Sequence, residues 1–301
     1  MNSSHLHGIL APVVSTFRAG NEELDLDAFA FNARAHLSAG LSGLVVAGST
    51  GEAALLDAAE RAALVETARA VVPKEKLLIV GTGAESTRTC LSQTRDAASR
   101  GADAVLVVAP HYYGPAMTAE ALRQHYRRVA DESPVPVILY SIPKYMHFPL
   151  PPALVKELAA HENVIGIKDS SGQRELIAGY LEAQSDTFTV LTGNAQQFHH
   201  SLSAGARGGI LAVALFAPAV SLEIYNSVVA GDDAAATAAQ ARMHPLGAKI
   251  VGELGVAGVK AAMDQVGLCG GPVRLPLQPL GAEQRRAVDE LLRSAELATA
   301  G

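Results

Sequence analysis

Tryptophan is absent from this 301-residue chain, aromatic residues are scarce, and there are only two cysteines. Cys90 and Cys269 lie far apart and show no metal-ligand spacing, so we expect two free thiols in a reducing compartment. No apolar run reaches the roughly 20 residues that a membrane-spanning helix requires. The N-terminal segment has no basic stretch ahead of its apolar residues, which argues against a secretory signal. We therefore expect a cytoplasmic protein.

Basic residues are fewer than acidic residues. The formal net charge is -6 and the pI is near 5.9, which argues against nucleic acids or anionic membranes as partners. Histidine and cysteine show no metal-binding spacing, because the adjacent His199 and His200 would point about 100° apart on a helix. We expect neither a metal site nor a cofactor.

Short apolar runs and helical stretches alternate along most of the chain. The predicted strands are 9–16, 43–46, 77–80, 104–108, 137–140, 164–168, 189–191 and 209–213. Continuous apolar runs of this length are typical of buried parallel strands. The helices predicted between them include 58–71, 87–99, 119–132 and 151–160, with Asp57 and Thr118 as N-caps.

Eight strand–helix repeats predict a (β/α)8 TIM barrel. The alternative is a doubly wound open sheet, which would need a glycine-rich phosphate turn that residues 14–17 do not supply. After the eighth strand, residues 216–230, 232–249, 254–266 and 282–298 have the pattern of helices. We expect a barrel over residues 1–215 and a C-terminal helical extension over 216–301 that packs against it.

Polar residues gather where the predicted strands end, which is where barrels of this kind carry their chemistry. The strand ends carry hydroxyls, an amine and bare backbone, in the segments Gly48–Glu52, Pro110–Tyr113, Tyr140–Pro143, Lys168–Ser170 and Thr192–Asn194. These segments should meet at one rim of the barrel.

Lys168 is the most informative of these residues. It closes the apolar run 164–167, a position where lysine seldom lies without a partner. Burial lowers the pKa of a lysine and supplies the neutral amine that attack on a carbonyl requires. The residues alone leave two interpretations equally open: a nucleophile for a carbonyl substrate, or a structural lysine paired with a carboxylate such as Asp169.

Tyr140 and a glycine-flanked turn add to the case for a site. Tyr140 stands 28 residues before Lys168, one strand–helix unit earlier, so adjacent strand ends should bring the two side chains together. A phenol can shuttle protons, although a lone strand-end tyrosine is more often a packing residue. The N–H groups and hydroxyls around Ser49 and Thr50 can hold a carboxylate, although the same residue types fill many ordinary turns.

The chain resembles the dihydrodipicolinate synthase/N-acetylneuraminate lyase superfamily over essentially its whole length. The resemblance rests on the Tyr-to-Lys interval and on Gly48–Glu52, Pro110–Tyr113, Tyr140–Pro143, Gly166–Ser170 and Gly193. It implies a class I aldolase or lyase that forms a lysine Schiff base with pyruvate. It also implies a homotetramer built as a dimer of dimers, and as ligands a small 2-oxo acid and an aldehyde.

The same resemblance implies roles for particular residues. Lys168 would attack C2 of the 2-oxo acid, and Tyr140 would shuttle protons. Ser49 stands where the family has a relay hydroxyl, and Tyr112 matches a tyrosine lent by a neighbouring subunit. The implied substrate-binding residues are Gly48, Thr50, Ser170, Gly193 and Leu211.

Two departures from the dihydrodipicolinate synthase pattern bear on the substrate. Tyr145 stands at the place of an arginine that binds the carboxylate of the aldehyde in those enzymes, and neighbouring Lys144 lacks the planar guanidinium. Ala58 and Arg61 stand about where the lysine-feedback histidines of that family are expected. Both departures argue against a role in lysine biosynthesis.

Other segments look most like 4-hydroxy-2-oxoglutarate aldolases. These are the Tyr-Ser-Ile-Pro form of the motif at Tyr140 and residues 112–117, 258–264 and 270–274, and Ser170 matches a substrate-contacting serine of that subfamily. We therefore predict cleavage of 4-hydroxy-2-oxoglutarate to pyruvate and glyoxylate.

Several alternatives stay open. Within the family they are 4-hydroxy-tetrahydrodipicolinate (dihydrodipicolinate) synthase and sugar-acid aldolases or dehydratases. From other classes, a non-catalytic 2-oxo acid sensor could retain the barrel, although binding alone would not require the Lys–Tyr–Ser–Tyr set. A metal-dependent barrel aldolase would need His and carboxylate ligands at several strand ends, where hydroxyls stand instead.

Overall fold

Eight parallel strands close into a barrel in the computed structural model, which describes residues 6–297. Each strand pairs with the next along the chain, and the last pairs with the first. The strands are β1 Gly8–Pro12, β2 Gly43–Val46, β3 Leu77–Gly81, β4 Ala104–Val108, β5 Val137–Ser141, β6 Val164–Asp169, β7 Thr189–Thr192 and β8 Gly208–Ile210. The predicted (β/α)8 fold is confirmed.

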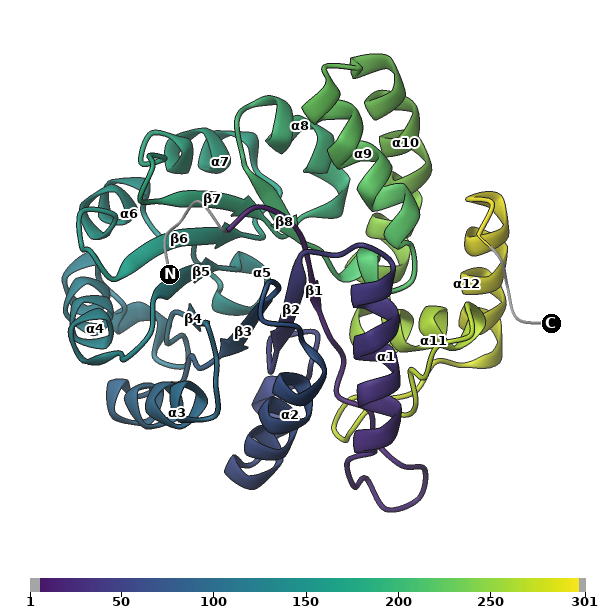
Figure 1. Cartoon of the computed structure of the whole chain (residues 1–301), viewed down its shortest axis with the longest axis horizontal. Coiled ribbons are helices and arrows are strands. Elements are labelled where there is room, and N and C mark those ends of the chain that lie inside the picture. The colour runs from purple at the N-terminus through teal and green to yellow at the C-terminus, as the bar shows by residue number, and fades with distance from the viewer. Residues whose placement is uncertain (1–5, 298–301) are drawn as a thin grey trace.

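Helices surround the barrel and cover the outer face of its strands (Figure 1). They are α1 Leu26–Ser38, α2 Ala58–Val71, α3 Thr87–Ser99, α4 Ala119–Glu132, α6 Pro152–Leu158, α7 Arg174–Leu181 and α8 Phe198–Ser203. The short helix α5, Pro143–Met146, follows directly after β5. Every residue of β2, β5 and β6 is buried, because helices cover one side of each strand and side chains fill the barrel on the other.

Local capping chemistry explains why some helix boundaries were predictable. The helices predicted at 58–71, 87–99 and 119–132 are observed with the same bounds. The Asp57 carboxylate accepts from the N–H of Glu60, whose own carboxylate accepts from the N–H of Asp57, forming a capping box. Thr118 accepts from the N–H of Ala121 in the same way.

Other boundaries differ from the prediction. The first strand ends at Pro12 rather than at 16, and the eighth ends at Ile210 rather than at 213. The apolar residues Ala212–Leu215 form a 3₁₀ helix, because a short apolar run does not by itself distinguish strand from helix. The helix predicted at 151–160 is the shorter α6, and that predicted at 282–298 ends at Ser294, while residue 298 lies outside the described residues.

The C-terminal part contains α9 Pro218–Ala230, α10 Asp233–Pro245, the π-helix η6 Leu246–Glu253, α11 Gly255–Gln265 and α12 Ala282–Ser294. One long helix was predicted at 232–249, whereas the α-helix ends at Pro245 and continues as η6. Proline has no N–H to donate to the preceding turn, which favours the change of hydrogen-bond pattern there.

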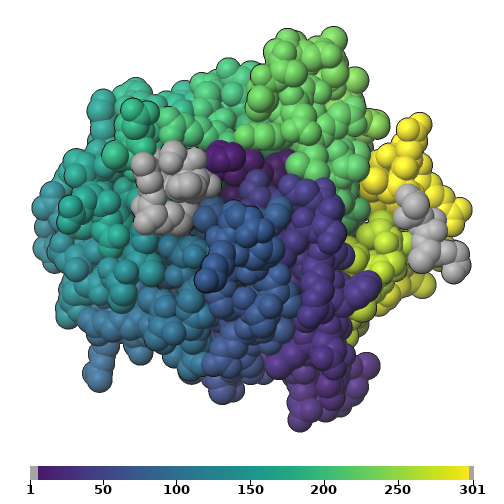
Figure 2. Space-filling model, viewed as in Figure 1, coloured from purple at the N-terminus to yellow at the C-terminus, as the bar shows by residue number. Residues whose placement is uncertain are grey.

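The C-terminal helices contact the barrel at several points. Helix α9 packs against α8 and β1, and α11 packs against η6 and α12. In the space-filling view, α12 (yellow) lies at the edge of the molecule (Figure 2). The division between barrel and extension at residues 215 and 216 stays a prediction.

Within residues 6–297, no helix is long and apolar enough to span a membrane. Cys90 and Cys269 are both free thiols, as predicted. Cys90 is buried, and burial raises the pKa of its thiol to about 12.

The buried histidine His36, in the last turn of α1, predicts a pH-dependent stability. Burial lowers its pKa from 6.5 to about 4, and its Nε2 has no hydrogen-bond partner. Between these two values the unfolded chain takes up a proton that the folded chain excludes, so stability falls as pH falls through this window. Between pH 7 and pH 4, the free energy of unfolding of the wild type should therefore fall by on the order of 3 kcal/mol more than that of the His36→Leu variant.

Urea unfolding at both pH values measures this difference. Comparing variant with wild type cancels the contributions of all other titrating groups. His244→Gln, at an exposed histidine, is the control and should keep the wild-type pH dependence. If the free energy of unfolding fell equally in the His36→Leu and wild-type proteins, the protonation of His36 would not be the cause of the pH dependence.

Candidate active site

Lys168 and Tyr140 lie side by side at the barrel mouth. The pairing of β5 with β6 sets Tyr140 opposite Lys168, and the Lys168 ammonium lies 4.2 Å from the centroid of the Tyr140 ring. The two residues are only 5% and 4% exposed. The juxtaposition predicted from their spacing is therefore present.

Asp169 does not pair with Lys168. Its carboxylate accepts from the N–H and hydroxyl of Ser171, at 3.1 and 2.8 Å. Burial raises the pKa of Asp169 to about 6. Because successive residues of a strand point to opposite faces, Asp169 leaves the barrel interior to Lys168. Within residues 6–297, no ion pair joins Lys168 to a carboxylate. The interpretation of Lys168 as a structural lysine required such a partner, so the structure argues against it.

A tight turn after β2 presents Ser49 and Thr50 to the same mouth. The carbonyl of Gly48 accepts from the N–H groups of Gly51 and Ala53, and the carbonyl of Ser49 accepts from that of Glu52. The Ser15 hydroxyl, which follows β1, donates to the Gly51 carbonyl at 2.7 Å. The turn is thus held by its own backbone and by the neighbouring strand end.

These residues surround a pocket of about 140 Å³. Its lining includes Ser49, Thr50, Tyr140, Lys168, Ser170 and Gly193, all predicted site residues. The charged residues of the lining are Lys144 and Lys168, and no Asp or Glu is among the described residues that line it. The pocket is therefore positively charged and suited to a small anion.

Three predicted site residues lie outside this lining. Leu211 is fully buried, and its neighbours Ile210 and Ala212 line the pocket instead, so the contact of Leu211 with substrate stays a prediction. Gly48 contributes its carbonyl to the turn rather than a surface to the pocket. Tyr112 is 77% exposed and packs edge-on against Tyr113.

Most of the far side of the pocket comes from residues that were not predicted to be part of a site; Asn194 is the exception, because it ends the predicted rim segment Thr192–Asn194. Asn194 and Gln196 follow β7, while Val251 and Gly252 belong to the π-helix η6. Lys144 donates from its ammonium to the Gly252 carbonyl at 2.7 Å, which ties α5 to η6. The sequence did not predict that η6 is a π-helix. Turns of π-helix frequently occur at functional sites.

Tyr145 stands between this pocket and a larger cavity of about 890 Å³. Burial raises the pKa of its phenol, and the nearby Tyr140 adds to the shift. The larger cavity is lined by His111, Glu85, Leu277 and residues 52–56 among others. Within residues 6–297, no group of three or more His, Cys, Asp or Glu side chains is arranged to hold a metal ion.

A (β/α)8 barrel with a buried lysine and tyrosine at its mouth, beside a turn of hydroxyls, is typical of the Schiff-base aldolases. The sequence model of the dihydrodipicolinate synthetase family matches residues 5–295. The chain therefore belongs to this family. It is a lyase of the aldolase type that forms a lysine Schiff base with pyruvate.

Relatives of known name cover nearly the whole chain. A 4-hydroxy-tetrahydrodipicolinate synthase from Xanthomonas axonopodis pv. citri is 37% identical over 290 residues, which is 96% of this chain and 95% of that protein. The synthase from Thermodesulfovibrio yellowstonii is 32% identical over 290 residues, which is 96% of this chain and 98% of that protein.

Among solved structures, the chloride-inhibited dihydrodipicolinate synthase from Acinetobacter baumannii, complexed with pyruvate, has a TM-score of 0.90 at 30% identity. The match covers 97% of this chain and 99% of that one. These names confirm the superfamily. They do not confirm the 4-hydroxy-2-oxoglutarate aldolase subfamily, and they favour the synthase that was the alternative prediction.

Gly193 provides a steric test of the site. A Cβ at this position would lie 2.0 Å from the Ser170 hydroxyl and 2.7 Å from Cε of Lys168, so Gly193→Ala must displace the lysine. We expect roughly a 100-fold loss of pyruvate-dependent turnover, because small misplacements of a reacting group cost this much. Steady-state rates and thermal unfolding measure the two effects separately.

The matched control is Gly281→Ala, where the nearest atom to the new Cβ would be Gln284 Oε1 at 3.8 Å. This variant should keep the wild-type rate. Wild-type turnover in the Gly193→Ala protein would mean that Lys168 is not held by this contact.

Proposed function

We propose that the protein condenses pyruvate with an aldehyde acid, aspartate semialdehyde, as a 4-hydroxy-tetrahydrodipicolinate synthase, with Lys168 as the Schiff-base nucleophile. The observation that carries the proposal is the position of Lys168, which is buried beside Tyr140 in the pocket and has no carboxylate partner among the described residues. The synthase name of the similar proteins supports the choice of reaction.

The pyruvate half of the reaction uses the side of the pocket formed by β2, β5, β6 and β7. The Lys168 amine attacks C2 of pyruvate, and water leaves to give an iminium. The iminium withdraws electrons, so C3 can lose a proton and become an enamine. In the proposed reaction Tyr140 and Ser49 move these protons, and the hydroxyls of the turn at Ser49 and Thr50 hold the pyruvyl carboxylate. All three residues line the pocket, which supports these roles.

The acceptor half uses the side formed by α5 and η6. The enamine C3 attacks the aldehyde carbon, whose oxygen takes up a proton, and a carbon–carbon bond forms. The amino group of aspartate semialdehyde then attacks C2, which displaces the Lys168 amine and closes the ring of the product. The pocket carries two lysines and, among its described residues, no carboxylate, which favours an acceptor that is itself an anion. Lys144 is the cation on this side of the pocket.

A second candidate is cleavage of 4-hydroxy-2-oxoglutarate to pyruvate and glyoxylate. In this case Lys168 forms the iminium with 4-hydroxy-2-oxoglutarate, and the bond between C3 and C4 breaks to release glyoxylate and leave the enamine of pyruvate. A proton then returns to C3, and water hydrolyses the iminium to release pyruvate from Lys168. The observation that favours it is Tyr145, which lines the pocket at the place where dihydrodipicolinate synthases are expected to have an arginine. Ser170 lines the pocket as well.

Tyr112 and the homotetramer belong to this proposal. The backbone N–H groups of His111 and Tyr112 donate to the Glu85 carboxylate at 3.0 and 2.8 Å, which fixes the backbone that carries the exposed Tyr112 ring. An exposed tyrosine held in this way is suited to reach the pocket of a neighbouring subunit.

Borohydride reduction in the presence of pyruvate tests the nucleophile. The iminium should be reduced to a stable amine, so that one pyruvyl group is added per chain and peptide mapping places it on Lys168. Lys168→Met should remain folded and unlabelled, since methionine fills a similar volume. Labelling of another lysine, or an unchanged mass of the wild-type chain, would contradict the assignment.

A comparison of two reactions tests the acceptor. We expect condensation of pyruvate with aspartate semialdehyde to have the higher kcat/KM, and cleavage of 4-hydroxy-2-oxoglutarate the lower. Coupled spectrophotometric assays on the same preparation measure both, with a chelator present as a control for metal dependence. Faster cleavage would replace the synthase with the aldolase and leave the Schiff-base chemistry in place.

A further inference from the structure

Glu52 and Lys260 form an ion pair in the interior, beside the pocket. The Lys260 ammonium lies 2.5 Å from Oε1 of Glu52, and the two side chains are 1% and 0% exposed. Lys260 also donates to the carbonyl of Pro272 at 2.7 Å. Oε2 of Glu52 accepts from the backbone N–H of Arg274 at 2.9 Å. Both charges are thus buried and both have further partners.

The pair joins two sides of the pocket that are far apart in the sequence. Glu52 ends the turn that carries Ser49 and Thr50, whereas Lys260 lies on α11, whose residues Val256 and Val259 line the pocket. The backbone of Glu52 has φ of 54°, a left-handed conformation that is unfavourable for a residue with a side chain. A specific contact is needed to hold such a residue in place.

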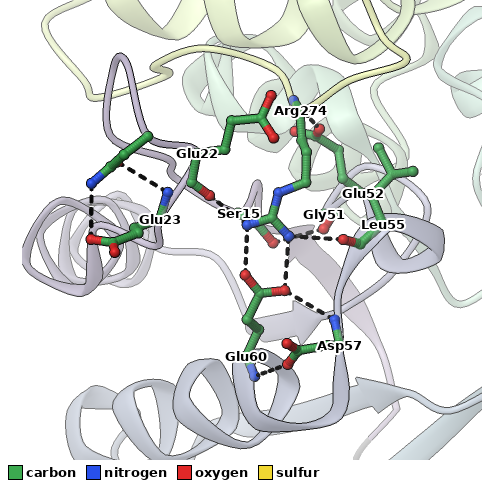
Figure 3. Close-up of polar contacts among 10 residues, drawn as sticks. Ser15, Glu22, Glu23, Gly51, Glu52, Leu55, Asp57, Glu60 and Arg274 are labelled. Carbon is green, nitrogen blue, oxygen red and sulfur yellow. Dashed lines mark hydrogen bonds and ion pairs between the residues drawn. The ribbon is translucent and has the colours of Figure 1, made fainter.

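Arg274 and Phe17 form a second layer around the pair. The Phe17 ring contacts both cations: its centroid lies 4.6 Å from the Lys260 ammonium and 4.2 Å from the Arg274 guanidinium. The guanidinium donates to both oxygens of Glu60, at 2.6 and 2.8 Å, and to the carbonyls of Leu55 and Glu22 (Figure 3). The chain that follows α11 is therefore fixed to the segment that follows the turn.

Neither member of the pair is placed to act on substrate. Both lie outside the lining of the 140 Å³ pocket. Burial lowers the pKa of Lys260, but the Glu52 carboxylate opposes this shift. The Lys260 amine is therefore engaged, whereas Lys168 has no such carboxylate among the described residues.

Stability alone is a weak explanation for the pair. Removing two charges from water costs about as much as their attraction returns, and well-packed apolar residues often replace a buried ion pair without loss. What apolar residues cannot supply is a fixed distance and direction between two backbone segments. An ion pair with hydrogen bonds on both sides supplies both.

We propose that Glu52 and Lys260 are positioning residues that hold the turn of Ser49 and Thr50 at the correct distance from Lys168 for binding of the pyruvyl carboxylate. The role rests on the proposed function, because it assigns the turn to pyruvate. It predicts that loss of the pair weakens the pyruvate step and spares the acceptor step.

The double variant Glu52→Gln/Lys260→Met tests the role, because it removes both charges while keeping both volumes. We expect cooperative unfolding with a Tm within about 5 °C of the wild type. The pyruvate concentration that half-saturates borohydride labelling, and the KM for pyruvate, should rise about 10- to 100-fold. The KM for the aldehyde should stay within about twofold, which a general loss of structure would not produce.

Two further proteins complete the design. Lys156→Met/Glu182→Gln removes an exposed ion pair of the same chemistry and should leave every constant unchanged. The single variant Glu52→Gln is used if the double variant does not fold. In the single variant Lys260 can lose its proton and remain buried, so no unpaired charge is left in the interior. This variant should show the same selective rise in the KM for pyruvate.

The outcomes separate this role from the proposed function. Wild-type constants for pyruvate in either pair variant, or equal losses for pyruvate and aldehyde, would overturn the positioning role. Unfolding of both variants would overturn it too, because the pair would then be structural. If the wild type binds pyruvate in calorimetry without borohydride labelling, the Schiff-base assignment fails, and the pyruvate Kd of the variants still decides the role of the pair.

Discussion

The register between β5 and β6 is the constraint on which the site depends. Val137 pairs with Val164, but a shift of one residue follows, so that Ile138 pairs with Gly166 and Tyr140 with Lys168. Without this irregularity Tyr140 would lie opposite Ile167, whose side chain points to the other face of the sheet. The contact between the ammonium and the phenol ring therefore exists because one residue of β6 is left out of the pairing.

Two buried lysines share the same surroundings in the sequence and differ in the structure. Lys168 and Lys260 each interrupt an apolar segment, and each lies over an aromatic ring, Tyr140 or Phe17. Lys260 meets a carboxylate at 2.5 Å, while Lys168 faces the pocket. A substrate in the pocket can therefore contact Lys168, whereas Glu52 holds Lys260, and that distinction is a property of the folded chain.

The two halves of the pocket have different origins. The side proposed to bind pyruvate is built from strand ends, whose positions follow from the barrel itself. The side proposed to bind the acceptor is built from α5 and η6, where Lys144 bridges to Gly252 across more than a hundred residues of chain. The barrel fixes one side of the pocket, while helices outside the barrel form the other side. Members of one family can therefore share their chemistry and differ in their substrates.

The sequence by itself determined the barrel, most helix boundaries and the set of residues at the mouth. Apolar runs, capping residues such as Asp57, and the interval from Tyr140 to Lys168 act locally or repeat regularly, so they can be read along the chain. Only the tertiary structure decided that Leu211 lies outside the lining of the pocket, that Lys168 has no carboxylate partner within residues 6–297, and that Glu52 meets Lys260. These outcomes depend on register, on the π-helical continuation after α10 and on contacts between distant segments, and no local pattern encodes them.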